Sequence, residues 1–552
     1  MKLKCQKMSE CDVLVIGAGG AGLRSAIAAK KNNADVLLVS KYRLGRTTNT
    51  YISKAVIAAS GWGEPDDNKD SFIDDTIKGG RFLNEHSKVS VIAHRIGDEI
   101  AFLKECGVHF GMQEGKPHLL KVPGHRYSRH VYGENWTGSD LVAPLIQTVR
   151  KKGIRTMDYV FISRLLRSGG HIAGAAGIKP NGDFIIIRAK TVILATGGYA
   201  QIFLNTNNAP GITGDGLALA YDLGVPLKDI EFIQFYPTAT GKRGNKLLLY
   251  EKLLGQKGVF VRNKEGIDII KKNGISDPMR INRDQLSQFI MKEIKAEPEG
   301  SQRIFLDLSN ISEGTAREMT QLIPSAWWKG QKQFEITPTA HFCMGGLVSD
   351  QWGETSQKGL FAAGEVSAGA HGSNRLSGNA LAEVFSWGSL VGAAAAERAA
   401  DIVSPLPDQE EIENEISRLE ALFSIHGMRP RDMIKDVKIL MWYKAGIIRE
   451  KKELEEALER LREPVPQAAV ETPDDLIKVL EFRNMRLIAE MVCTAAVQRT
   501  ESRGSHYRTD YREENNRQWL KNILFRKGDA GMEVKTRPLT GDSPGRACYS
   551  SL

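Results

Sequence analysis

The residues with the most informative spacing are glycines near the start of the chain. Gly17, Gly19 and Gly22 form a GxGxxG pattern, with Gly20 inside it, between a short apolar run and a segment of helical periodicity. In such a turn the first glycine permits a tight bend, the second lets backbone approach a pyrophosphate, and the third lets the helix pack on the strand. The pattern predicts a dinucleotide site, and its alternative is a glycine-rich turn without a ligand.

The second strand of this unit ends without the acidic residue that usually binds a ribose about 20 residues after the glycines. Ser40 and Lys41 stand there instead. The absence of this acid argues against a site specific for NAD. The remaining candidates for the bound dinucleotide are FAD, or NAD held in an unusual way.

Elements that could position this turn are visible in the hydrophobic pattern. Residues 12–16 and 35–39 are apolar runs typical of buried strands, and residues 20–31 have one apolar helical face. This is a βαβ unit, which favours a parallel sheet. Two later apolar runs, 191–198 and 359–364, end in glycine clusters and predict strands that lead into ligand-facing loops. From about residue 405 helical periodicity dominates, with a helix start at Thr472 and Pro473.

Composition excludes several classes of protein. The chain has 552 residues, 41% of them hydrophobic, and a net charge of +9 without a run of five or six like charges. We therefore expect two to four domains and no nucleic-acid partner. The six cysteines form no CxxC pair, which predicts reduced thiols and neither a metal nor an iron–sulfur site. No apolar segment is long enough for a signal peptide or a membrane span, so we expect a cytoplasmic chain.

A series of motifs resembles the flavoprotein subunits of fumarate reductase and succinate dehydrogenase, and L-aspartate oxidase. The matching segments occur in the family's order over about residues 10–525. They are 39–41, 48–59, ATGG at 195–198, NTN at 205–207, TGDG at 213–216, DIEFIQFYPT at 229–238, RDQLS at 283–287, HFCMGG at 341–346, AAGEVSAGAHGSNRLSGNAL at 362–381 and ESRGSHYRTDY at 501–511.

The resemblance implies FAD as the tightly held cofactor. Asp215 and Glu365 each follow a small-residue turn, where a carboxylate can accept hydrogen bonds from sugar-like hydroxyls, although either could be a plain surface acid. Asn49 stands where succinate dehydrogenases carry the histidine that bonds covalently to the flavin, which predicts non-covalent FAD. The residues implied to contact FAD are Gly17, Gly19, Gly20, Gly22, Ser40, Lys41, Asn49, Thr50, Asp215, Glu365, Ala380 and Leu381.

The resemblance also implies a site for a small carboxylate substrate. Arg375 and His341 match the residues that hold a substrate carboxylate, and a guanidinium fork suits that task. Arg283 matches the family's proton donor and Glu251 its relay carboxylate. The next relay position, an arginine in the family, is Leu254 here, which puts the proton path in question.

Two further positions depart from the family. Tyr236 replaces the histidine of the family's HPT motif, and Tyr250 replaces the threonine before the relay glutamate. Tyrosine is neutral near pH 7, with a pKa of about 10. We therefore hypothesise a substrate with one carboxylate and a larger, neutral or aromatic far end; fumarate held by a rearranged set of groups is the alternative.

The predicted fold class is α/β, with a Rossmann-like discontinuous FAD-binding domain, an α+β capping domain and a C-terminal helical domain. We expect the FAD domain at 1–225 and 338–405, the capping domain at 226–337, and the helical domain at 406–552. Closure of the cap would exclude water from the reaction.

The predicted function is hydride transfer between flavin N5 and a C=C or C–C bond next to a carboxylate, as the catalytic subunit of an electron-transfer complex. An iron–sulfur subunit is the expected partner, and partners could hold the chain peripherally at the inner face of a membrane. Two alternatives stay open. One is an amino-acid oxidase of the L-aspartate oxidase kind, and the other is an electron-relay flavoprotein with an altered substrate site.

Overall fold

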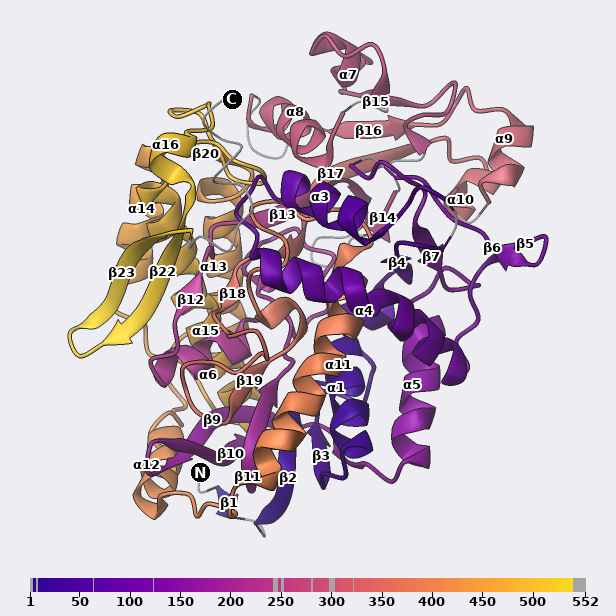
Figure 1. The fold of residues 1–552 in the computed structure, drawn as a ribbon. Coiled ribbons are helices and arrows are strands. Elements are labelled where there is room, and N and C mark those ends of the chain that lie inside the picture. The colour runs from indigo at the N-terminus through magenta and orange to yellow at the C-terminus, as the bar shows by residue number, and fades with distance from the viewer. Residues whose placement is uncertain are drawn as a thin grey trace.

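The computed structural model describes residues 3–5, 8–62, 64–122, 124–241, 247–249, 253–278, 281–296, 303–320 and 322–539. They form a large α/β body, a smaller cap at one end and a helical C-terminal part that lies against the body (Figure 1). Among these residues, no helix combines the length and apolar character that a bilayer crossing needs. The same residues hold no cluster of three or more potential metal ligands.

The body is built on an eight-stranded sheet whose main path is β8–β3–β2–β11–β10–β9, with β1 and β19 also paired to β11. These strands are β1 (Lys4–Cys5), β2 (Ser9–Ile16), β3 (Val36–Val39), β8 (Arg155–Met157), β9 (Phe161–Ser168), β10 (His171–Ile178), β11 (Asp183–Leu194) and β19 (Leu360–Ala362). The parallel strands β2, β3, β11 and β19 are covered on both faces, so their sequences are nearly continuous apolar runs. The predicted βαβ unit is therefore confirmed.

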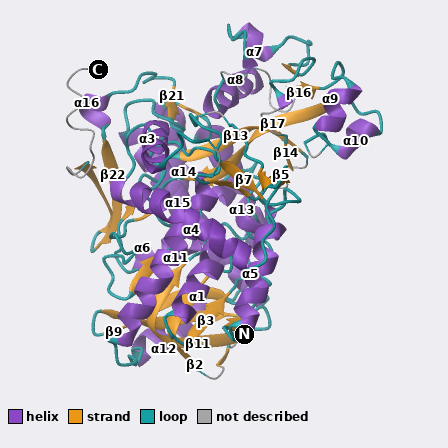
Figure 2. Ribbon diagram, turned by 45° about the vertical axis from the view of Figure 1, so that its right-hand side comes forward, coloured by secondary structure: helices purple, strands orange, loops and turns teal. Residues whose placement is uncertain are grey.

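Two helices from distant parts of the chain pack side by side on this sheet. They are α1 (Gly20–Lys31) and α11 (Asn379–Ala400), and Figures 1 and 2 both show them adjacent. A Cβ at Gly392 would lie 2.2 Å from the Ser25 carbonyl oxygen, so the two backbones approach closely. Further helices cover this side of the body, namely α3 (Lys69–Gly79), α4 (His86–Glu105) and α5 (Ser139–Lys151).

The cap is a five-stranded sheet in the order β14–β13–β17–β16–β15, with four short or medium helices. Its elements are β13 (Ile233–Thr240), β14 (Leu247–Leu248), β15 (Phe260–Arg262), α7 (Ile269–Lys272), α8 (Arg283–Lys295), β16 (Ile304–Asp307), α9 (Glu313–Glu318), α10 (Ser325–Trp328) and β17 (Gln333–Cys343). The cap has a hydrophobic cluster of its own. β13 and β17 pair antiparallel and run from the body into the cap, so they bring side chains to the junction.

The C-terminal part begins as four helices, α12 (Gln409–Glu420), α13 (Pro430–Lys444), α14 (Lys451–Arg462) and α15 (Pro473–Gln498). Thr472 caps α15 by accepting a hydrogen bond from the Asp475 amide, as its sequence predicts. The sequence did not predict the β-hairpin that follows, formed by β22 (Lys521–Gly528) and β23 (Gly531–Pro538). This hairpin joins β12 (Leu227–Lys228) and β18 (Gly346–Leu347) in a four-stranded sheet.

Candidate functional site

One cavity of about 740 Å³ runs from the glycine turn after β2 to the underside of the cap. The turn lies at the carboxyl end of a parallel strand, which is where ligands bind in open α/β sheets. The cavity brings together most of the residues that the sequence analysis selected. They are Gly17, Gly19, Gly20, Ser40, Lys41, Asn49, Thr50, Asp215, Tyr236, Arg283, His341, Glu365, Arg375, Ala380 and Leu381.

The glycines of the turn divide into two kinds. A Cβ at Gly17, whose φ is +112°, would lie 2.2 Å from the Ala195 carbonyl oxygen, and one at Gly22 would lie 1.8 Å from the Gly17 oxygen. Both are therefore required by backbone packing, and Gly22 is buried beneath the turn rather than lining the cavity. Gly19 differs, because its nearest neighbours, in Thr48 and Thr50, would be 3.8 Å away. Gly19 lines the cavity and its backbone is not crowded, as expected of a residue that lets a ligand approach the backbone.

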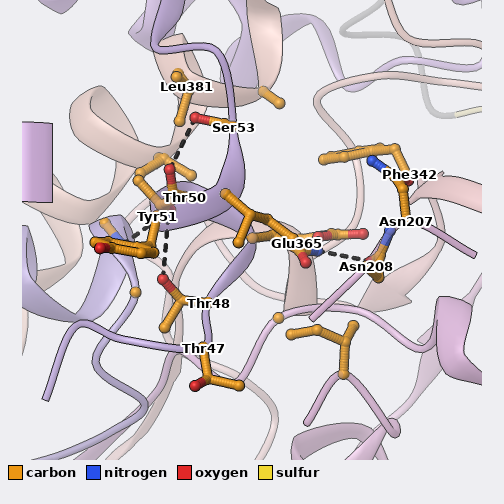
Figure 3. Close-up of a pocket in the computed structure, with 18 of the residues that line it drawn as sticks. Thr47, Thr48, Thr50, Tyr51, Ser53, Asn207, Asn208, Phe342, Glu365 and Leu381 are labelled. Carbon is orange, nitrogen blue, oxygen red and sulfur yellow. Dashed lines mark hydrogen bonds between the residues drawn. The ribbon is translucent and has the colours of Figure 1, made fainter. Parts of the chain in front are cut away.

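A short helix, α2 (Asn49–Ile52), forms the opposite wall of the turn (Figure 3). Thr48 caps this helix by accepting from the Tyr51 amide, and Ser53 donates to the Thr50 carbonyl oxygen. The Gly20 amide donates to Thr50 Oγ1 at 3.0 Å, which ties α2 to the start of α1. These contacts hold the amide-rich edge of α1 against the cavity.

Lys41 and Asp215 form an ion pair at the same end of the cavity. Lys41 Nζ lies 2.8 Å from Asp215 Oδ2 and 2.5 Å from Glu481 Oε1. Burial alone would lower the pKa of Lys41, but these two carboxylates raise it above its ordinary value. Asp215 Oδ1 also accepts from Thr213 and from Asn484. Asp215 is thus fixed at the start of α6 (Asp215–Asp222), on the cavity wall.

Glu365 and Asn49 meet further along the cavity. Glu365 Oε1 accepts from the Cys343 amide at 3.0 Å and Oε2 accepts from Asn49 Nδ2 at 3.2 Å. Burial nevertheless raises the pKa of Glu365 to about 7, because these hydrogen bonds only partly offset the loss of water. Asn49 also donates to Asn208 and accepts from the Ala209 amide. Figure 3 shows Glu365 beside Asn207 and Asn208, two residues that the sequence analysis did not select as ligand contacts.

The cap end of the cavity gathers the candidate substrate-binding groups. Arg283 is the first residue of α8 in the cap, Tyr236 lies on β13 and His341 on β17. The Arg283 guanidinium carbon lies 4.9 Å from the centre of the Tyr236 ring, and the His341 ring centre lies 5.6 Å from it. Arg375, from the loop before α11, stacks on Phe342 at 4.8 Å. The Tyr236 ring therefore contacts two groups that can hold an anion or supply a proton.

Gln234 orients Arg375, and the sequence analysis missed it. Gln234 Oε1 accepts from Arg375 Nη2 at 2.8 Å, while its Nε2 donates to Asn374 Oδ1 and to the Arg375 carbonyl oxygen, both at 2.8 Å. The Gln234 side chain is buried, and its oxygen and its nitrogen both form hydrogen bonds with the loop that carries Arg375. The sequence did hold one signal for Gln234: it stands two residues before Tyr236, and residues i and i+2 of a strand share a face. Gln234 could therefore have been expected on the same side of the strand as Tyr236.

His341 is held as a neutral imidazole. Its Nδ1 lies 3.2 Å from Asn207 Oδ1. Burial, then the nearby guanidinium groups of Arg375 and Arg283, hold the pKa of His341 well below its usual value. An anion bound between these groups would offset the two positive charges and raise that pKa. The pocket is thus prepared for a negative ligand.

The proton-relay positions give a mixed result. Tyr250 and Glu251 lie outside the described residues. Leu254, which the resemblance aligns with the family's relay arginine, is buried in the hydrophobic cluster of the cap. Asp284 directly follows Arg283 in α8. Burial raises the pKa of Asp284 to about 6, although the charges of Arg283 and Arg81 oppose this rise.

The described residues fit an FAD along this cavity. The open space beside Gly19 faces the start of α1, whose amides suit a pyrophosphate. Asp215 and Glu365 place carboxylate acceptors along the wall, and Ala380 and Leu381 line it from the start of α11. FAD would therefore reach from the glycine turn toward the arginines under the cap.

Comparisons with known proteins agree with this geometry. A family described as "FAD binding domain" matches residues 12–381, and one described as "Fumarate reductase flavoprotein C-term" matches residues 434–544. A chain of the fumarate reductase (CoM/CoB) from Methanothermobacter marburgensis is 33% identical, over 94% of this chain and 98% of its own. The Escherichia coli fumarate reductase flavoprotein subunit is 31% identical, over 98% and 96%.

Solved structures give the same picture. An E. coli quinol fumarate reductase structure superposes with a TM-score of 0.86 at 28% identity, covering 97% of each chain. The Sdh1 structure of Mycobacterium smegmatis superposes with a TM-score of 0.87 at 30% identity, covering 99% of this chain and 98% of that one. The likeness therefore extends over the body, the cap and the C-terminal part together.

Proposed function

The chain belongs to the fumarate reductase and succinate dehydrogenase flavoprotein family and is an FAD-dependent oxidoreductase of that type, and from this premise we propose that it reduces or forms a C=C bond next to a carboxylate. The observation that carries the proposal is the gathering of Arg283, His341 and Arg375 at the far end of the cavity that begins at the glycine turn. Bound FAD would supply the two-electron hydride chemistry that no side chain can supply.

Arg375 and His341 hold the substrate carboxylate in this proposal. The Arg375 guanidinium is kept in one orientation by Gln234 and by stacking on Phe342, so little freedom is lost when it binds an anion. His341, neutral and fixed through Asn207, adds a hydrogen bond. The carboxylate is polarised and its neighbouring carbons are placed between Arg375 and the cap residue Arg283.

Arg283 donates the proton to the substrate carbon. Arginine ordinarily remains protonated, so it can act only if its proton is replaced at once. Leu254 carries no proton, so we propose that the replacement proton reaches the half-buried Arg283 from solvent.

For the domains we propose the boundaries expected from the sequence: 1–225 with 338–405, 226–337, and 406–552. In support, β13 begins soon after residue 226, and β17, which contains residue 337, leads back from the cap to the body. The relatives' names describe parts of larger enzymes. We therefore propose that the partner is an iron–sulfur electron-transfer subunit, with any membrane association arising through partners.

Anaerobic reoxidation of the chemically reduced holoprotein tests the reaction. Adding an unsaturated carboxylate should restore the absorbance of oxidised flavin, and Arg283→Ala should slow that step by ~10²–10⁴-fold. Arg317→Ala is the matched control, because Arg317 is an exposed arginine of the same cap that pairs only at the surface with Glu313. Reoxidation by no unsaturated carboxylate would reject the proposal, and hydrogen peroxide release on adding L-aspartate would favour an amino-acid oxidase instead.

A further inference from the structure

The part of the cavity under the cap has a chemistry of its own, and the inference drawn from it rests on the proposed function. Its wall combines residues from three separate segments of the cap. Those segments are β13, β14 with the residue after it, and the loop before α10, and the residues they supply are Tyr236, Thr240, Leu248, Leu249, Leu322, Ile323 and Pro324. Most of this wall is aliphatic. It therefore favours an apolar group in the space beside Arg283.

The charged groups of the site are placed asymmetrically. Among the described residues of 226–337 that line the cavity, Arg283 alone carries a charge. Its guanidinium lies over the Tyr236 ring, and the His341 ring packs edge-on against the same ring. Tyr236 is buried, with 1% of its surface exposed. Its ring therefore presents an uncharged surface next to Arg283 and His341.

A second carboxylate would be poorly served in this space. The carboxylate grip of the site, Arg375 with His341, binds one anionic end. An anion placed against Leu322 and Ile323 would lose its water to an aliphatic surface, with Arg283 as the one cation that the described cap residues supply, which is costly in an apolar pocket. A hydrocarbon or aromatic group loses nothing there and can pack on the Tyr236 ring.

We propose that the substrate is a monocarboxylate 2-enoate with an apolar or aryl substituent at C3, or the corresponding saturated acid in the reverse direction. In reduction, the C=C bond is lost as C3 gains a hydride from reduced flavin and C2 gains a proton from Arg283. The enoate is reduced, the flavin is oxidised, and a proton from solvent replaces the one that the half-buried Arg283 has given up. In the assay a chemical reductant supplies the two electrons beforehand.

The decisive experiment compares three enoates with the anaerobically reduced holoprotein in stopped flow. The compounds are 3-phenylacrylate, 2-butenoate and fumarate, each at several concentrations. We expect 3-phenylacrylate to reoxidise the flavin with kcat/KM at least ~10-fold above that of fumarate. Fumarate reacting fastest would overturn the substrate class and leave the proposed function standing. Failure of all three would instead count against the proposed function itself.

A binding measurement separates recognition from turnover. Calorimetry with the anaerobically reduced holoprotein should show tighter binding of 3-phenylpropanoate than of succinate, since reduced flavin can neither reduce nor oxidise a saturated acid. Equal or tighter binding of succinate would overturn the inference.

A substitution at the apolar wall provides a further test. Leu322 is only half-buried, so Leu322→Arg should fold and place a cation where the wall is now aliphatic. The kcat/KM ratio of fumarate to 3-phenylacrylate should rise at least ~10-fold. Ile267→Arg is the matched control, because Ile267 is exposed on the cap away from the cavity. An unchanged ratio in a folded Leu322→Arg protein would contradict the placement of the substrate's far end.

Discussion

Gly19→Ala separates the two roles that glycines play in the turn after β2. Gly19 has φ −76° and ψ −175°, a conformation open to any residue. An added Cβ would meet its nearest atoms at 3.8 Å, an ordinary contact. Alanine is a poorer helix cap than glycine, but it also reduces the entropy of the unfolded chain by ~0.4–1 kcal/mol. The flavin-free variant should therefore unfold within about 1 kcal/mol of the wild type.

FAD affinity should respond much more strongly. The new methyl group would occupy the open space where the pyrophosphate approaches the start of α1. A hydrogen bond to a charged group contributes ~1.5–3 kcal/mol, so losing one such contact corresponds to a dissociation constant ~10–150-fold higher. Flavin is removed from both proteins, and FAD is titrated back while its fluorescence is followed. Denaturant unfolding of the flavin-free proteins measures stability separately.

Gly22→Ala is the control with the opposite expectation. Its Cβ would lie 1.8 Å from the Gly17 carbonyl oxygen, so backbone has to move, which costs at least ~1–3 kcal/mol of stability even without flavin. A Gly19→Ala protein that keeps both its stability and its FAD affinity would refute the assignment of this turn to the pyrophosphate. A Gly22→Ala protein as stable as the wild type would refute the packing argument.

Three other predictions follow from individual side chains. The pKa of Glu365 rises from its ordinary 4.5 to about 7, so ionisation of Glu365 destabilises the folded flavin-free protein. Relative to Glu365→Gln, the free energy of unfolding of the wild type should fall by about 3 kcal/mol as the pH rises from 4.5 to 7. Denaturant titration between pH 5 and 8 measures this fall. Gln234→Leu removes the acceptor that orients Arg375, and calorimetry should show a carboxylate Kd ~10–100-fold higher in a protein whose thermal melt confirms folding. Because Asn49 cannot form the covalent flavin bond of a histidine, acid precipitation should leave a colourless pellet and a yellow supernatant.

The fold of the cofactor end could be predicted from sequence because local rules determine it. The apolar runs at 12–16 and 35–39 became β2 and β3, and the helix predicted at 20–31 became α1. Backbone packing fixes this region so tightly that glycine is required at Gly17 and Gly22. The same holds for α15, whose start is set by Thr472 and Pro473.

Contacts between distant segments were beyond the reach of such rules. The place of Gln234 two residues before Tyr236 suggests a shared face, but the sequence does not reveal that its partner is Arg375, 141 positions later. Asn208 likewise meets Asn49 only because a loop folds back beside α2. The terminal hairpin β22–β23 was missed because its partner strand, β12, lies nearly 300 residues earlier.

The two ends of the cavity are under different physical constraints, and this explains where the sequence departs from its family. At the glycine turn the wall is backbone, so a changed residue would disrupt the fold and the cofactor site together. Under the cap the wall is side chains, supplied by strands and loops whose own core lies elsewhere. The resemblance aligns Tyr236 and Leu254 with a histidine and an arginine of the family, and side chains at such positions can change without disturbing the chain path. In the substrate class proposed above, the uncharged Tyr236 ring packs against the far end of the acid, and the comparison of 3-phenylacrylate with fumarate decides whether it does.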